Sequence, residues 1–184
     1  MMMNRIALVA ALLCATFAAA QQDKSQRPSP PAQAQCKFSD GKTITVDYSS
    51  PRLKGRKVGG EVAPYGQIWR TGANEATTFV TNADLTVAGK DVPAGGYTIF
   101  TLPTADAWTL IINKHTGEWG IPYKYESEEL MRVPMSVSQT PAPIENFTIS
   151  FDQAGGGCAL QLSWGTTLAS VGFGEKNADV PMKP

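Results

Sequence analysis

The sequence predicts an all-β protein, an antiparallel two-sheet β-sandwich with barrel-like closure as an alternative and at most one short helix. Three observations support this prediction. Apolar and polar side chains alternate over short stretches, which is typical of half-buried strands. Turn residues separate these stretches at close spacing. The one helical candidate, residues 126–131, is shorter than a typical helix.

The first clear strand has Ile44, Val46 and Tyr48 on one face and polar residues on the other. Later stretches repeat this alternation and are rich in β-branched and aromatic residues, which favour strands. These further strands are expected at 85–87, 97–102, 108–112, 147–151, 158–164 and 168–173. The chain therefore consists mainly of short strands in close succession.

Glycine and proline mark the turns between the expected strands. Asp40-Gly41 predicts a tight hairpin turn before the first clear strand. Further turns are expected at 88–90, 93–96 and 155–157. Pro134 lacks a backbone N–H, so the apolar run 132–137 is expected to lie at a sheet edge.

The N-terminus has the pattern of a secretory signal peptide. Arg5 is followed by the apolar stretch 6–17 and then by Ala18-Ala19-Ala20. We expect cleavage before Gln21 and a periplasmic or secreted mature protein. Lipid attachment at Cys14 is an alternative, but the leucine before it is larger than such processing prefers. The apolar stretch is shorter than the roughly 20 residues that a membrane span needs, and we expect no span in the mature chain.

The rest of the chain divides into three parts. Residues 21–35 are rich in proline and glutamine and predict a flexible leader. Residues 36–174 predict a single β-sandwich domain, and 175–184 a frayed tail. The 16 basic and 16 acidic residues balance, which argues against a nucleic-acid-binding surface. The one basic cluster, 52–57, is expected to be a solvated loop.

Two cysteines remain after the expected cleavage, Cys36 and Cys158. An even number of cysteines in an oxidising compartment favours a disulfide between them. The chain has a single histidine and no cluster with metal-ligand spacing. We therefore expect neither a metal site nor a cofactor.

The stretch 69–77, called here the 69–77 segment, shows neither strand nor helix periodicity before its last residue. Arg70 and Glu75 are its only charges, and they stand among apolar and small residues. A buried charge needs a partner, so we expect these two side chains to pair, to be joined through Asn74, or to point together into a polar pocket. A salt bridge that only fixes a loop is the structural alternative.

A second polar and aromatic stretch spans 113–123. Its Trp119 could stack on a sugar or cap one end of the core, and His115 is more typical of a surface loop than of a catalytic base. The candidate ligand-binding residues are therefore Trp69, Arg70, Asn74, Glu75, His115 and Trp119.

Short motifs extend over nearly the whole expected domain. They include Tyr48-Ser49-Ser50-Pro51-Arg52, Lys54-Gly55-Arg56, Pro64-Tyr65-Gly66, the string from Trp69 to Thr77, Pro93-Ala94-Gly95-Gly96-Tyr97 and Trp119-Gly120. Together they resemble an uncharacterised bacterial family, the domain of unknown function with number 2911. The resemblance implies an exported bacterial protein and implies no particular activity.

Three functions are compatible with the sequence. The favoured one is a module that binds a small polar molecule or a glycan around the 69–77 segment. A hydrolase of glycans or esters, using carboxylates such as Glu75 and Glu118, is an alternative, although no nucleophile motif is present. A structural protein of the cell envelope is the third, and no residue is assigned a catalytic role.

Overall fold

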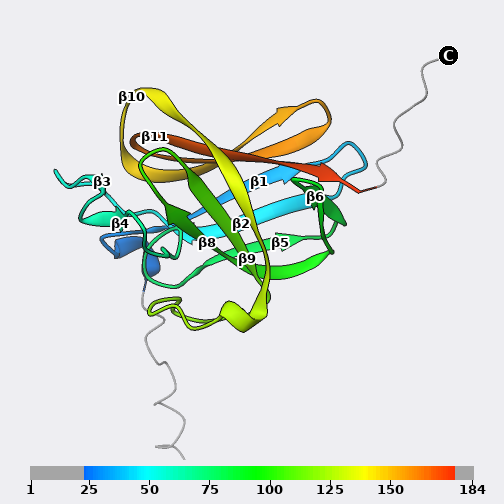
Figure 1. Cartoon of the computed structure of the whole chain (residues 1–184), viewed down its shortest axis with the longest axis horizontal. Helices are drawn as coiled ribbons and strands as arrows, with labels where there is room; N and C mark the ends of the chain where they lie inside the picture. Colours follow the sequence, from blue (N-terminus) through cyan, green and yellow to red (C-terminus); the bar gives the residue numbers. More distant parts are fainter. Residues whose placement is uncertain (1–22, 177–184) are drawn as a thin grey trace, which may run out of the picture.

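One antiparallel sheet of nine strands forms the body of the molecule in this computed structural model, which describes residues 23–176 (Figure 1). The all-β prediction is therefore confirmed. In spatial order the strands are β1 (Pro31–Lys37), β2 (Thr43–Ser49), β5 (Thr77–Thr81), β8 (Gly95–Pro103), β9 (Trp108–Asn113), β10 (Glu129–Ala154), β11 (Gly157–Glu175), β6 (Leu85–Val87) and β7 (Lys90–Val92). The expected signal peptide, 1–20, lies outside the described residues.

The remaining elements are small. Strands β3 (Val58–Gly59) and β4 (Val62–Pro64) form a separate parallel pair. Two 3₁₀ turns, η1 (Lys24–Gln26) and η2 (Glu126–Glu128), are the helical elements of residues 23–176. The expected helix at 126–131 is thus a single turn that leads directly into β10. In this part of the chain no helix has the length and apolar character to cross a membrane.

Strand β10 connects two layers of the folded sheet. Its first part pairs with β9, from Glu129 opposite Asn113 to Met135 opposite Trp108, and its later part pairs with β11 from Ser136 onward. Figure 1 shows β10 curving from beside β9 to beside β11. The two predicted layers are therefore joined by β10, which pairs with strands of both layers. The end strands β1 and β7 do not pair with each other in the described structure, so the sheet stays open.

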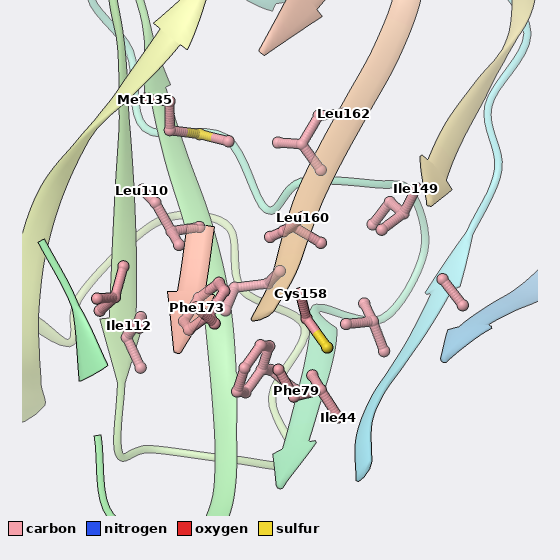
Figure 2. Packing of buried hydrophobic residues seen from close by; sticks show 14 of the residues in the cluster. Ile44, Phe79, Leu110, Ile112, Met135, Ile149, Cys158, Leu160, Leu162 and Phe173 are labelled. Atoms are coloured by element: carbon pink, nitrogen blue, oxygen red, sulfur yellow. The ribbon is translucent and has the colours of Figure 1, made fainter. Parts of the chain in front are cut away.

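The main core lies between these layers. Apolar side chains of β11 point toward those of β2, β5 and β9, as Figure 2 shows for Leu160, Ile44, Phe79 and Leu110. All four are fully buried. The period-two alternation in the sequence therefore identified the inward-facing residues correctly, because each strand has one face on the core.

A smaller apolar cluster lies on the outer face of β8 and β9. Phe100 and Ile111 are fully buried there beneath Tyr123 and Tyr125 of the loop that follows β9. The amide of Asn113 donates to the hydroxyl of Tyr123 at 3.1 Å and to the carbonyl of Tyr125 at 2.7 Å. These contacts fix the loop, residues 114–125, against the sheet. Trp119 belongs to this loop and is exposed.

The folded part begins earlier than the sequence indicated. Strand β1 starts at Pro31, within the expected flexible leader 21–35, and pairs with β2 from Pro31 opposite Ser49 to Lys37 opposite Thr43. Before Cys36 its inward side chains are only the small Ala32 and Ala34, so its composition resembles a linker. At the other end β11 continues to Glu175, which pairs with Lys42. Most of the expected frayed tail lies outside the described residues.

A disulfide joins the two layers. Cys36 on β1 and Cys158 on β11 are bonded, with their Cα atoms 6.1 Å apart. Both are buried in the core, and Figure 2 shows Cys158 among the surrounding apolar side chains. The disulfide predicted from the cysteine count is present in the structure.

Candidate functional site

A cleft of about 420 Å³ opens between the 69–77 segment and the loop 114–125. Arg70 and Asn74 line it from the first, and Trp119 and Ile121 from the second. The cleft is also lined by Arg56, Glu61, Val62, Ala63 and Pro64, with Ser29 and Trp164 among the further lining residues. The cleft therefore brings together parts of the chain that are far apart in sequence.

The backbone around the cleft adopts unusual conformations. Thr71, Asn74 and Ala63 have φ values of 55°, 59° and 43°, in the left-handed region of backbone conformation that residues other than glycine rarely adopt. Thr71 is completely buried, and Thr77 donates to its carbonyl at 2.8 Å. Such strain persists only where surrounding contacts determine the conformation, and it clusters at functional sites.

Gly120 allows the loop to approach the 69–77 segment closely. Its φ is +88°, and a Cβ there would lie 2.9 Å from the Cβ of Ala76 and 3.3 Å from that of Arg70. Any larger residue would force these two parts of the chain apart. Glycine at this position therefore determines the distance between Arg70 and Trp119.

Arg70 is the central charge of the cleft. Its Nη1 donates hydrogen bonds to the backbone carbonyls of Asn74 and, at 3.0 Å, of Trp119. Its Cζ lies 5.2 Å from the centre of the Trp119 ring, which is a cation–π arrangement. Burial lowers the pKa of Arg70, yet a guanidinium keeps its charge at neutral pH. Within residues 23–176 no carboxylate forms an ion pair with Arg70.

The expected ion pair between Arg70 and Glu75 does not form. Glu75 instead pairs with Arg27 at 2.9 Å and with Lys24 at 3.1 Å, and its side chain is 43% exposed rather than buried. The expected connection of both charges through Asn74 is not formed either, because only Arg70 hydrogen-bonds to Asn74, at its backbone carbonyl. The prediction was wrong because the segment before β1, expected to be flexible, is ordered against Glu75 and supplies its cationic partners.

Trp69 forms the floor of the cleft and belongs to the core. Its ring stacks on that of Trp164 at 5.5 Å and meets Phe147 edge to face at 4.8 Å. Its backbone N–H donates to the carbonyl of Thr101 at 2.8 Å, and the reciprocal bond is 2.9 Å. Trp69 therefore anchors the 69–77 segment to β8 and gives the cleft an aromatic base.

His115 and Glu75 are not among the residues that line the cleft. The ring of His115 stacks on Tyr125 at 4.5 Å, and its Nδ1 lies 3.1 Å from a carboxylate oxygen of Glu128. These contacts fasten the loop 114–125 to η2. Of the six candidate residues, the structure brings together Trp69, Arg70, Asn74 and Trp119.

The carboxylates suggested for hydrolysis do not meet in the cleft. Glu75 is held by its two cationic partners, and both carboxylate oxygens of Glu118 are buried without a hydrogen-bond partner. Among the described residues there is also no group of three or more His, Cys, Asp or Glu side chains that could hold a metal ion. The polar and aromatic groups that line the cleft include the guanidinium of Arg70, the amide of Asn74 and the rings of Trp69, Trp119 and Trp164.

Sequence analysis missed several lining residues. Ser29 accepts a 2.9 Å hydrogen bond from the Asn74 amide through its carbonyl, and no side-chain property signals this role. Arg56 belongs to the basic cluster that the sequence showed, but its place in the same cleft as Arg70 depends on the fold. Trp164 is one of the alternating core residues of β11. It also lines the cleft, and the alternation alone does not indicate this.

The fold and the cleft define the class of protein: an all-β domain with two layers joined by a disulfide and an arginine–tryptophan cleft at one end. A family model described as "Protein of unknown function (DUF2911)" matches residues 29–173. The chain therefore belongs to this family, as the resemblance of its motifs indicated. Comparisons with curated proteins and with solved structures yield no match.

Proposed function

We propose that this protein is a binding module whose cleft takes a small polar ligand that carries an anionic group, such as a carboxylated sugar. One observation carries the proposal: Arg70 lines the cleft without an ion-pair partner among residues 23–176. Only its Nη1 is occupied by hydrogen bonds within these residues. A guanidinium offers a planar pair of donors that matches a carboxylate.

The rim of the cleft supports a ligand with an apolar face. Trp119 is 54% exposed and Ile121 is 37% exposed, although large apolar side chains are usually buried. An exposed tryptophan beside a cation suits a sugar ring, whose C–H face stacks on the indole while its polar groups meet Arg70 and Asn74. The same residues leave no evident nucleophile, so binding is favoured over hydrolysis.

The proposal is tested with galacturonic acid and glucuronic acid as probes and with galactose and glucose as their neutral counterparts. We expect the acids to bind and the neutral sugars to bind at least about tenfold more weakly, since a charge-assisted hydrogen-bonded pair is worth roughly 1.5–3 kcal/mol. Isothermal titration calorimetry measures both. Failure of every acid to bind at millimolar concentration would contradict the proposal and favour a structural role in the envelope.

A matched pair of variants separates binding from folding. Arg70→Lys keeps the charge but loses the planar two-point donor, so it should weaken binding of the acid while the protein stays folded. Lys37→Gln removes an exposed charge from the far end of β1, about 20 Å along the strand from Pro31. It should leave binding unchanged, and an equal loss in both variants would count against a site at Arg70.

We also propose that the protein acts outside the cytoplasm, in the periplasm or after secretion. The support is the pattern of residues 1–20, together with the Cys36–Cys158 disulfide, which suits an oxidising compartment. The mature chain should begin at Gln21. Intact-mass measurement of the exported protein checks this, and a mass that retains Met1 would disprove it.

A further inference from the structure

The loop between β2 and β3 carries a concentration of positive charge. Arg52, Lys54, Arg56 and Lys57 lie within residues 52–57, called here the basic loop, and three of them, Lys54, Arg56 and Lys57, are exposed. None of the four forms an ion pair within residues 23–176. The cluster was expected to be solvated, and one of its members, Arg56, also lines the cleft.

The carboxylates that touch the basic loop do not neutralise its side chains directly. Glu145 accepts a 2.8 Å hydrogen bond from the backbone N–H of Lys54, and Glu61 accepts one of 3.1 Å from the backbone N–H of Lys57. The carbonyl of Glu145 also accepts from the N–H of Leu53 at 3.0 Å. These bonds hold the loop in place and leave its ammonium groups free to meet a ligand.

The basic loop and the cleft form one continuous surface. Arg56 and Glu61 line the same cleft as Arg70. The guanidinium of Arg56 is oriented by hydrogen bonds to the carbonyls of Leu53 at 2.9 Å and of Arg52 at 2.7 Å. The basic loop therefore contributes one of its charges, Arg56, to the cleft that Arg70 lines, and Lys54 and Lys57 lie within two residues of Arg56 along the chain.

We infer that the natural ligand is a carboxylated oligosaccharide, one acidic unit of which occupies the cleft at Arg70 while further units cross Arg56 to the basic loop. This inference rests on the proposed function and specifies its ligand. A single sugar acid would engage Arg70 alone and leave the neighbouring cations unused. A chain with a carboxylate on each unit would engage several cations at once and gain affinity through multivalency.

Glu61 and Trp119 favour a sugar chain over other polyanions. Glu61 places a carboxylate among the cleft-lining residues, where it can accept hydrogen bonds from the hydroxyl groups of a sugar, which polyanions without hydroxyl groups cannot donate. The exposed Trp119 offers a face for a sugar ring. The charged and apolar groups also surround a concave cleft, whereas an anionic membrane surface would be met by a flat or convex patch.

The test compares galacturonic acid with its linear hexamer, and uses neutral maltohexaose and phosphatidylglycerol vesicles as alternative probes. The hexamer should bind at least about tenfold more tightly than the monomer, and increasing salt should weaken hexamer binding more than monomer binding. In Lys54→Gln/Lys57→Gln the hexamer should lose most of this advantage while the monomer binds as before. Lys37→Gln/Lys90→Gln removes the same charge from β1 and β7 and should retain the full advantage.

The outcomes distinguish the inference from the proposed function. Equal affinity for monomer and hexamer would overturn the oligosaccharide inference and leave the proposed function standing. Hexamer binding that is unaffected by the Lys54→Gln/Lys57→Gln change would also overturn it, as would tighter binding to the vesicles than to the hexamer. Absence of binding to any acid, with both variants folded by circular dichroism, would refute the proposed function and this inference together.

Discussion

Arg70 contacts Trp119 in two ways: its guanidinium donates a 3.0 Å hydrogen bond to the Trp119 carbonyl and lies 5.2 Å from the centre of the Trp119 ring. The hydrogen bond fixes one nitrogen, and the ring limits the plane in which the guanidinium can turn. Because the tryptophan is more than half exposed, the pair presents a charge and an apolar face together. This relationship is the basis of the binding role proposed for the cleft.

Arg70 and Glu75 should behave as independent residues in a double-mutant cycle. Arg70→Ala frees two backbone carbonyls at a half-buried position, and we expect a loss of about 1–2 kcal/mol in the free energy of unfolding. Combining it with Glu75→Ala should give an additive effect, because the two side chains do not pair. By contrast, Arg27→Ala and Glu75→Ala should be coupled by about 0.5–1 kcal/mol. Urea denaturation of the single and double variants measures both cycles.

Acid should weaken the attachment of the N-terminal segment. A hydrogen bond from its own backbone N–H, followed by the guanidinium of Arg27, lowers the pKa of Glu75 from 4.5 to about 2. A lowered folded-state pKa contributes stability above the unfolded value, and this contribution disappears as pH falls from about 4.5 through 2. The stability advantage of the wild type over Glu75→Gln should therefore shrink across this window. An advantage that stays constant between pH 6 and pH 2.5 would disprove the coupling.

Glu118→Gln should stabilise the protein. Both carboxylate oxygens of Glu118 are buried without a hydrogen-bond partner, and a buried unpaired charge is more costly than a buried neutral amide. We expect a gain on the order of 1 kcal/mol in the free energy of unfolding. Thermal and urea denaturation at neutral pH measure it, with Glu128→Gln as a comparison at a carboxylate that has a partner. A clear loss of stability in Glu118→Gln would contradict the expectation.

The disulfide should make a large contribution to stability. Cys36 and Cys158 are separated by 122 residues, and closing a loop of this length in the unfolded chain corresponds to about 4–5 kcal/mol in the chain-entropy treatment. Cys36→Ala/Cys158→Ala should lower the free energy of unfolding by up to this amount. Titration of the denatured, unreduced wild type should detect no free thiol from this pair, and two free thiols would disprove the bond.

The sequence was a good guide to strands and a poor guide to contacts between distant segments. Alternation identified Ile44, Val46 and Leu160 as inward-facing because a strand buries one face by a rule of period two. The same rule was not applied at β1, where Ala32 and Ala34 alternate with glutamines but are too small to mark a buried strand face. Strand β1 is held in place by its backbone hydrogen bonds to β2, and the local amino-acid composition does not reveal this pairing.

Part of the lining of the cleft could be anticipated from the sequence. The unusual composition of the 69–77 segment singled out Arg70 and Asn74, and these residues line the cleft together with Trp119, while their role in binding stays a prediction. The partner of Glu75 was missed because a lone pair of opposite charges in one segment suggested mutual pairing. In the folded chain Arg27, almost fifty residues earlier, competes for Glu75 and leaves Arg70 to the cleft. The spacing of charged residues along the chain does not determine which of them pair in the folded protein.

The dependence of both layers on β11 has a consequence for how the protein is made. A chain that is synthesised from its N-terminus presents Cys36, Arg70 and Trp119 well before Cys158 and Trp164 exist. Until β11 is complete, the inward faces of β2, β5 and β9 lack their cover, the disulfide lacks one sulfur and the cleft lacks part of its aromatic base. Truncated products should therefore expose apolar surface to chaperones and proteases, and only a chain whose translation has finished can complete the cleft.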